Sequence, residues 1–272
     1  MVVIMSAVLL AFTLLFAPAL SADGGYSQNG ADWTGVCQSG TTQSPIDIQG
    51  YTDVDSSDGF SVLSLSFNSM TSYTKTVSGY SYKYSGVHGS LTAVDNAKLS
   101  NYTNYGTSMS FHAPSEHYLD GKQYAGEMHI QYEPTSSTNS SPYAYTIIVV
   151  FFEEGAENSF LTAFQSTSPA SLNLNTLFSS NTVDNYYMYK GSKTSFPCAE
   201  AAQYYVLDQI YTASAAQLKV FTDLWASNPS FAGGKGNNRA LQNLNGRTIY
   251  HFDDSSAATT VLGLLFGLFL VA

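Results

Sequence analysis

Residues 110–117, SFHAPSEH, and residues 127–131, EMHIQ, form the stretch around which the rest of the sequence is organised. Together they contain three of the five histidines of the chain. Each segment has the length of a short strand, in which successive side chains point to opposite faces. Ser110 and His112 would then share one face, and the odd-numbered residues of the second segment would share another. If the two strands are neighbours, His112 and His129 converge on one spot.

Two interpretations fit this pair of histidines. In the first, His112 and His129 hold a metal ion, because neutral imidazole is the commonest protein ligand for metals. In the second, they are buried, hydrogen-bonded histidines with a structural role. Spacing alone favours the structural interpretation.

The surrounding sequence changes that balance. Residues 111–130, FHAPSEHYLDGKQYAGEMHI, resemble the zinc-site segment of the α-class carbonic anhydrases, whose pattern runs roughly His-Trp-His-x-x-Ser-Glu-His and then Glu-Leu-His. The resemblance extends from Trp33 to about Arg247 and includes QSPIDI at 43–48 and EEGAEN at 153–158. It implies a single domain with a large, twisted, mainly antiparallel sheet and small peripheral helices.

The resemblance also implies a metal site, but one of the family's three ligand positions differs in this chain. In the family, three histidines hold a Zn²⁺ ion whose bound water ionises near neutral pH and attacks CO₂. His112 and His129 match the second and third ligands, but the position of the first is Ser110. We therefore expect weak or absent zinc binding. His88, from another strand, is the alternative candidate for the third ligand.

Several other residues of this chain match positions that have a defined role in the family. Glu127 matches the carboxylate that fixes the tautomer of the third histidine. Thr194 matches the threonine that accepts the hydrogen of the zinc hydroxide, and Glu116 matches the glutamate that orients this threonine. His117 matches a structural histidine. Tyr80 stands at the position of the proton-shuttle histidine, where a tyrosine with a pKa of about 10 is a poor shuttle at neutral pH.

The predicted substrate pocket differs from the family pattern at several points. It consists of Gln131, Ile147, Lys193, Ala202 and Tyr204. Gln131 replaces a valine, Lys193 a leucine and Tyr204 a tryptophan, while Ser108 replaces the glutamine that supports the first histidine. A lysine beside a cation site opposes zinc binding through charge repulsion.

Both ends of the chain have the composition of targeting segments. Residues 1–22 are apolar and end in ALSA, which is typical of a cleaved secretory signal peptide. Residues 253–272 begin with DDSSAA and continue as an apolar run, which resembles a signal for attachment of a GPI lipid anchor. Membrane-spanning helices are the alternative at both ends, for which these apolar runs are short. With residues 23–252 as the domain, the sequence predicts a lipid-anchored protein on the extracellular face of the plasma membrane.

Other features agree with an extracellular protein. Cys37 and Cys198 are the two cysteines of the chain, and such a pair in a secreted protein predicts one disulfide, with two free thiols as the alternative. Related secreted family members carry a bridge at these positions. Asn101 and Asn139 begin N-glycosylation sequons. Because Asp and Glu number 20 against 10 Lys and Arg, a nucleic-acid partner is not expected.

The local patterns predict mostly strands. Short strands are expected at residues 60–67, 75–77, 80–84 and 91–94, between Gly and Ser clusters. Residues 143–152 are almost continuously apolar, which predicts a central strand buried on both faces. Residues 214–226 predict a helix, because Ser214 and Gln217 have the spacing of a capping box.

Three functions remain open from the sequence. The first is a carbonic-anhydrase-related surface protein that is a non-catalytic binding or structural module with an unidentified partner. The second is an active zinc carbonic anhydrase that interconverts CO₂ and bicarbonate. The third is an adhesion or coat domain with a vestigial cavity. The missing histidine favours the non-catalytic functions.

Overall fold

The computed structural model describes residues 24–78, 81–95, 100–135, 141–228 and 234–253. Its helices are α1 (Val36–Ser39), α2 (Ser159–Gln165) and α3 (Ala215–Ala226), with 3₁₀ turns η1 (Ser56–Asp58) and η2 (Leu174–Thr176). Its strands are β1 (Asp47–Ile48), β2 (Thr52–Val54), β3 (Leu63–Phe67), β4 (Thr74–Ser78), β5 (Ser81–Ser85), β6 (Gly89–Asp95), β7 (Ser100–His112), β8 (Tyr118–Leu119), β9 (Lys122–Gln123), β10 (Gly126–Glu133), β11 (Tyr145–Glu154), β12 (Thr182–Val183), β13 (Asn185–Gly191), β14 (Ala202–Ala213) and β15 (Tyr250–Asp253).

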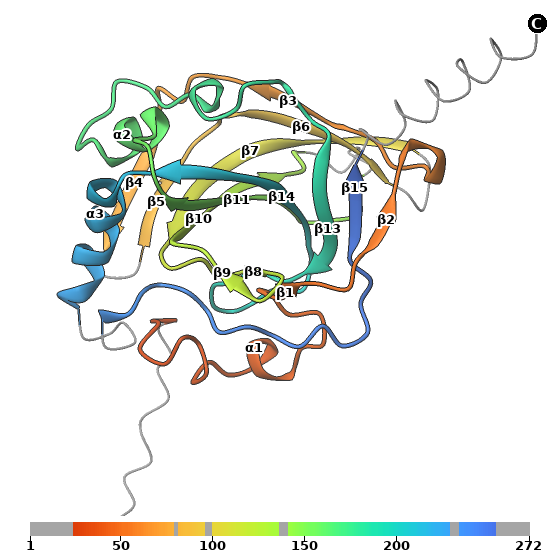
Figure 1. Ribbon diagram of the computed structural model, residues 1–272, viewed down its shortest axis with the longest axis horizontal. Coiled ribbons are helices and arrows are strands. Elements are labelled where there is room, and N and C mark those ends of the chain that lie inside the picture. The colour runs from red at the N-terminus through yellow and green to blue at the C-terminus, as the bar shows by residue number, and fades with distance from the viewer. Residues whose placement is uncertain (1–23, 79–80, 96–99, 136–140, 229–233, 254–272) are drawn as a thin grey trace, which may run out of the picture.

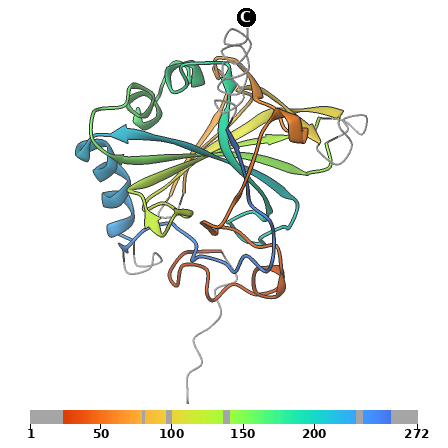
Figure 2. The ribbon, with the colours of Figure 1, turned by 45° about the vertical axis from the view of Figure 1, so that its right-hand side comes forward.

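One large twisted sheet runs through the molecule (Figures 1 and 2). Its strand order is β12-β3-β6-β7-β10-β11-β14-β13-β15-β2. In addition, β5 pairs with the C-terminal part of β7, and β4 pairs with β5. Most neighbours are antiparallel, whereas β11 and β14 are parallel, as are β15 and β2. Strands β1, β8 and β9 form a separate small sheet. The predicted mainly antiparallel sheet with peripheral helices is therefore confirmed.

Strand β11 lies near the middle of this sheet and has a hydrophobic core on each face. Residues 146–152 are all buried, as the continuous apolar run predicts. Ile148 and Val150 belong to one core, and Val149 and Phe151 belong to the other. The strand begins and ends two residues later than predicted, because it starts at Tyr145 and includes the two glutamates that follow Phe152.

Helices α2 and α3 lie together at one end of the sheet (Figure 1). Ser214 caps α3, and its side chain accepts from the backbone N–H of Gln217, as the capping-box spacing predicts. Gln217 also bonds the backbone of Asn158, which caps α2. The ring of Phe221 on α3 stacks on Phe111 at 3.9 Å between centroids. Phe111 lies between Ser110 and His112 in β7 and faces away from them, so α3 supports this strand from behind.

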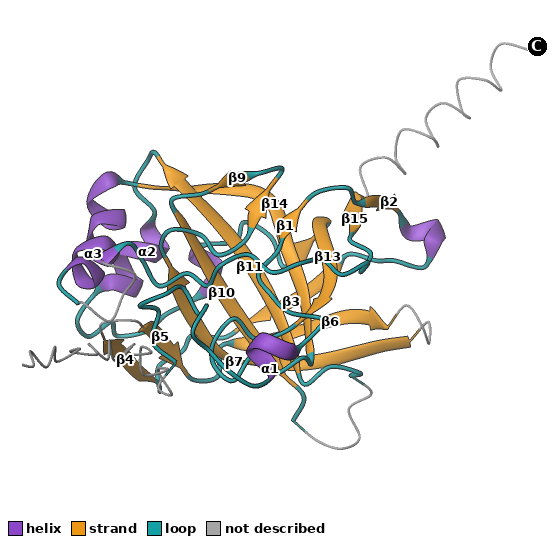
Figure 3. Cartoon of the chain, turned by 90° about the horizontal axis from the view of Figure 1, so that it is seen from below, coloured by secondary structure: helices purple, strands orange, loops and turns teal. Residues whose placement is uncertain are grey.

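The C-terminal segment 237–249 runs beside the N-terminal segment (Figure 1), whose short helix α1 is labelled in Figure 3. Arg239 joins the two: its guanidinium is buried and donates to the backbone oxygens of Cys37 and Ser44. Cys37 is bonded to Cys198, with 5.0 Å between their Cα atoms. The predicted disulfide is therefore confirmed.

Several predicted features lie outside the described residues. These are the signal peptide at 1–22, the anchor signal beyond Asp253, the proton-shuttle position Tyr80 and the sequon at Asn139. Asn101 is described, and its side chain is exposed on β7. Within the described ranges, no helix combines the length and the apolar character needed to cross a bilayer.

Candidate functional site

Strands β7 and β10 bring the two histidines together. Their antiparallel register places His129 directly opposite Ser110, and Glu127 directly opposite His112. Directly opposite residues point to the same face of a sheet, so these four side chains lie on one face. The imidazole rings of His112 and His129 are 4.7 Å apart between centroids. The predicted convergence is confirmed.

His112 is held by the C-terminal segment. Its Nδ1 lies 2.9 Å from the backbone oxygen of Asn237, and a carbonyl oxygen only accepts, so Nδ1 carries the hydrogen. Burial lowers the pKa of His112, although the nearby Glu116 acts in the opposite direction. The ring is therefore neutral, and its Nε2 keeps a free lone pair.

His129 is held by Glu127. Its Nε2 contacts Glu127 Oε1, which also accepts from His117 Nδ1 at 2.8 Å. The other carboxylate oxygen accepts the backbone N–H groups of Glu116 and His117. Burial would raise the pKa of Glu127, but His117 and His129 hold it well below its usual range. Glu127 is thus an ionised acceptor that leaves the lone pair of His129 on Nδ1, in the orienting role predicted for it.

His117 takes no part in the cavity. Its second ring nitrogen, Nε2, lies 2.5 Å from the hydroxyl of Tyr189, and the side chain is fully buried. The hydroxyl of Tyr189 in turn donates to Ser44. This arrangement agrees with the structural role predicted for His117.

The predicted pair of Thr194 and Glu116 is not formed in this structure. Glu116 Oε1 accepts the backbone N–H of Arg239 at 2.8 Å. Glu116 Oε2 has no hydrogen-bond partner among the described residues and lies 3.8 Å from His129 Nε2. Thr194 lines the cavity, and no hydrogen bond joins it to Glu116 within the described ranges. The Glu116 carboxylate is instead directed at the backbone of Arg239 and at His129, and the roles carried over to Thr194 and Glu116 stay predictions.

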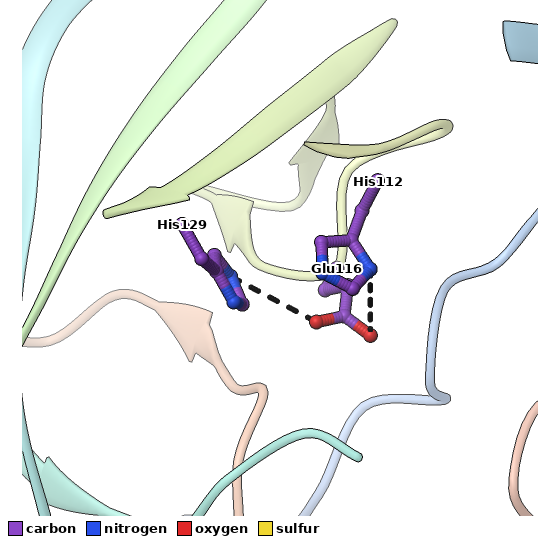
Figure 4. Close-up of side chains that lie close together, drawn as sticks. All are labelled: His112, Glu116 and His129. Atoms are coloured by element: carbon purple, nitrogen blue, oxygen red, sulfur yellow. Dashed lines mark ion pairs between the residues drawn. The ribbon is translucent and has the colours of Figure 1, made fainter. Parts of the chain in front are cut away.

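His112, Glu116 and His129 form a cluster that has the composition of a metal site (Figure 4). One nitrogen or oxygen from each lies within 4.8 Å of the others. However, the nitrogens that face Glu116 are Nδ1 of His112 and Nε2 of His129, and both are already hydrogen-bonded to Asn237 and Glu127. A metal at Glu116 would have to break both bonds. The nitrogens that remain available are His112 Nε2 and His129 Nδ1.

A cavity of about 280 Å³ opens beside the two histidines. Its walls include Ser108, Ser110, His112, His129, Gln131, Ile147, Lys193, Thr194 and Tyr204. Of the predicted pocket residues, Ala202 does not line it. Ala202 pairs with Tyr145 at the start of β14, two positions before Tyr204, and lies in the hydrophobic core.

His88 is not near this cavity. Its buried ring packs edge-on against Tyr132, with centroids 5.1 Å apart. Tyr132 follows Gln131 in β10, so its side chain points to the opposite face of the sheet. The structure therefore does not bring His88 to His112 and His129 as a third ligand.

Two lysines line the cavity, one of which the sequence did not indicate. Lys193 Nζ donates to Gln131 Oε1 at 3.0 Å. Lys83 in β5 lies directly opposite Ser110, so Lys83, Ser110 and His129 form one row across three strands. The alternation of polar and tyrosine residues at 81–85 predicts a two-faced strand, but it does not say which strand lies next to it. Asn237 was also missed, because it acts through a backbone oxygen.

Comparisons with known proteins agree with this geometry. Residues 28–253 match the family model of eukaryotic-type carbonic anhydrases. A carbonic anhydrase of Pectobacterium atrosepticum is 30% identical over 226 residues, which cover 79% of this chain and 82% of the relative. One of Pectobacterium carotovorum is 31% identical over 245 residues, covering 84% and 90%. The solved α-carbonic anhydrase of Photobacterium profundum superimposes with a TM-score of 0.62 at 27% identity, over 79% of this chain and 91% of that one.

Proposed function

Because this chain belongs to the eukaryotic-type carbonic anhydrase family, we propose that it is a carbonic-anhydrase-related protein whose cavity binds a ligand and does not hydrate CO₂. The family acts on CO₂ and bicarbonate with zinc, and this member would lack that zinc-dependent reaction. We further propose that it is secreted and lipid-anchored at the cell surface, from the composition of residues 1–22 and 253–272.

The observation that carries the proposal is Ser110 beside His129. Zinc in carbonic anhydrase needs three imidazoles and an open fourth position. Here the nitrogens available to a metal in the cavity are His112 Nε2 and His129 Nδ1, and the residue beside them on the same face is a serine. A neutral hydroxyl on a short side chain is a poor substitute for imidazole, so this donor set does not fit a catalytic zinc ion.

The charge beside this donor set supports the same conclusion. Lys193 lines the cavity, where its ammonium group would repel a divalent cation. Among the described residues, the buried Glu116 Oε2 has no hydrogen-bond partner, and the threonine that it would orient is not bonded to it. Without zinc hydroxide there is nothing for Thr194 to orient, so we assign these residues no catalytic step.

An active zinc carbonic anhydrase is the second candidate. One observation favours it: His112 and His129 keep the outer hydrogen bonds, to Asn237 and Glu127, that leave a nitrogen of each ring free for a metal. The third ligand would have to come from solvent or from a rearranged Glu116.

Zinc content and CO₂ hydration of the purified protein distinguish the two candidates. We expect less than about 0.1 zinc per chain after dialysis against a weak chelator, since two donors hold the ion poorly. We also expect hydration no faster than in buffer, measured by stopped flow with a pH indicator. Stoichiometric zinc with fast, sulfonamide-sensitive hydration would establish the second candidate instead.

A further inference from the structure

We propose that the cavity beside His112 and His129 is a metal-independent binding site for a small organic carboxylate, whose carboxylate group is held by Lys83 and Lys193 and whose apolar body lies against Ile147 and Tyr204. This inference rests on the proposed function in one respect only, namely that no zinc ion occupies the cavity. It names the class of ligand that the binding module takes.

The two lysines give part of the cavity wall a positive charge. Both line it, although the whole protein carries a net charge of −10 with only 10 lysines and arginines. Among the described residues, no carboxylate lies within 4 Å of either ammonium group. The acidic group that acts on both is Glu133, which is bonded to Gln131 and Thr107 instead. Two positive charges therefore face one negative charge.

Both ammonium groups are partly desolvated. Burial lowers the pKa of Lys83, with Glu133 acting in the opposite direction. Burial also lowers the pKa of Lys193, and the nearby Lys83 lowers it further. A charged group that loses water without gaining an ionic partner costs free energy, and an anionic ligand offsets that cost.

The remaining walls indicate where the carboxylate group lies. His112 and His129 direct lone pairs into the cavity, and lone pairs accept hydrogen bonds but do not attract an anion. Ser110 lies in the row between Lys83 and His129, and its hydroxyl is available as a donor at the lysine side. We therefore place the carboxylate group over Lys83, Lys193 and Ser110.

The size of the cavity and its apolar residues indicate the rest of the ligand. A cavity of about 280 Å³ is at the small end of the range for small-molecule sites. The residues next along the sheet from Gln131 are Ile147 and then Tyr204, which form a continuous apolar row. Tyr26 and Phe196 add aromatic surface. A compact carboxylate with an apolar body fits both the lysines and these apolar residues.

Benzoate and benzamide test this proposal, because they share shape and differ in charge. Calorimetric titration of chelator-treated protein should show benzoate binding at least about tenfold more tightly than benzamide, as expected for hydrogen bonds to charged groups. Lys83→Met and Lys193→Met should each weaken benzoate by about tenfold and leave benzamide unchanged. Lys83→Arg and Lys193→Arg should retain most of the affinity. Lys122→Met is the matched control, because Lys122 is exposed and paired with Glu153 outside the cavity.

Each outcome of this experiment bears on the proposal. Equal binding of benzoate and benzamide, or benzoate binding that neither lysine affects, would overturn it. So would binding that appears only after zinc is added. Thermal unfolding of each variant excludes a general loss of fold, and the arginine variants separate loss of charge from loss of packing. Zinc measured in the same protein before chelation decides the proposed function separately, since stoichiometric zinc would refute that function whatever benzoate does.

Discussion

Ser110 and His129 lie directly opposite each other on neighbouring antiparallel strands, so a hydroxyl and an imidazole stand side by side on one wall of the cavity. Neighbouring side chains in such a pair are about 5 Å apart at their Cβ atoms. A histidine at position 110 would therefore place a third imidazole beside the two that are already present.

This relationship predicts that Ser110→His creates a zinc site. Zinc content after dialysis, measured by inductively coupled plasma mass spectrometry, should rise to about one ion per chain. The reason is that three imidazoles hold zinc far better than two. Ser108→His is the matched control, since it adds an imidazole to the same face two residues away, opposite Gln131. Adding Lys193→Leu to Ser110→His should recover part of the CO₂ hydration activity. If Ser108→His raised zinc content equally, the position of Ser110 would not be decisive.

Asn237 should be essential for the orientation of His112 and for stability. Its side chain accepts a hydrogen bond from the backbone N–H of Ala113 and donates one to the backbone oxygen of Phe111. It therefore pairs two backbone groups at the C-terminal end of β7. Asn237→Ala leaves both buried groups unpaired, which should lower the free energy of unfolding by about 2 kcal/mol or more. Asn243→Ala, which changes an exposed asparagine in the same segment, should lower it by less than about 0.5 kcal/mol. Urea denaturation compares them, and equal losses would contradict the role of Asn237.

His88 should make the protein less stable in mild acid. Its ring is buried, and burial lowers its pKa from 6.5 to about 4, although backbone groups of Ser108 and Gln131 act in the opposite direction. As the pH falls below 6.5, the unfolded chain binds a proton at this residue before the folded chain does. The free energy of unfolding should therefore decrease, and by pH 4 the loss approaches about 3 kcal/mol.

His88→Phe tests this by removing the titration while keeping a ring against Tyr132. The variant should lose less stability than the wild type between pH 7 and pH 4, as measured by urea denaturation at each pH. Tyr132→Phe is the control, because it removes a hydroxyl that has no hydrogen-bond partner in the described part of the chain and does not titrate in this range. Identical pH dependence in His88→Phe and the wild type would show that His88 is not the residue responsible.

The disulfide should contribute strongly to stability. It joins residues 161 positions apart, and closing a loop of that length in the unfolded chain corresponds to about 5 kcal/mol on the chain-entropy estimate. The double change Cys37→Ser and Cys198→Ser should lower the free energy of unfolding by several kcal/mol. Reduction of the wild type should have a similar effect. A loss below about 1 kcal/mol in both experiments would contradict the estimate.

The sequence predicted best those features that depend on a single strand or helix. Alternation of side chains gave the faces of Ser110, His112 and His129, and the apolar run gave the central strand β11. The capping pair Ser214 and Gln217 gave the helix α3. In each case the signal is local, because a strand has a period of two residues and a cap spans one turn.

The features of the site that the sequence did not predict depend on which distant segments pack against each other. Lys83 lines the cavity because β5 pairs with β7, and alternation does not identify a neighbouring strand. The contact between Glu116 and Arg239 was missed for the same reason, since the backbone N–H of Arg239 donates to one carboxylate oxygen. Such a contact involves residues more than 100 positions apart and a backbone group that every residue carries.

The bond between His112 and Asn237 spans 125 residues, and this separation has a consequence for biosynthesis. At about 5–20 residues per second, a ribosome needs roughly 6–25 s to add Asn237 after His112. For most of that interval the nascent chain already contains both histidines and Glu127 but lacks the group that orients the first ring. Arg239, which binds Glu116 and the N-terminal segment, is added later still. The cavity is therefore a late product of translation, and a metal ion or ligand that meets the growing chain earlier meets side chains that are not yet held in place.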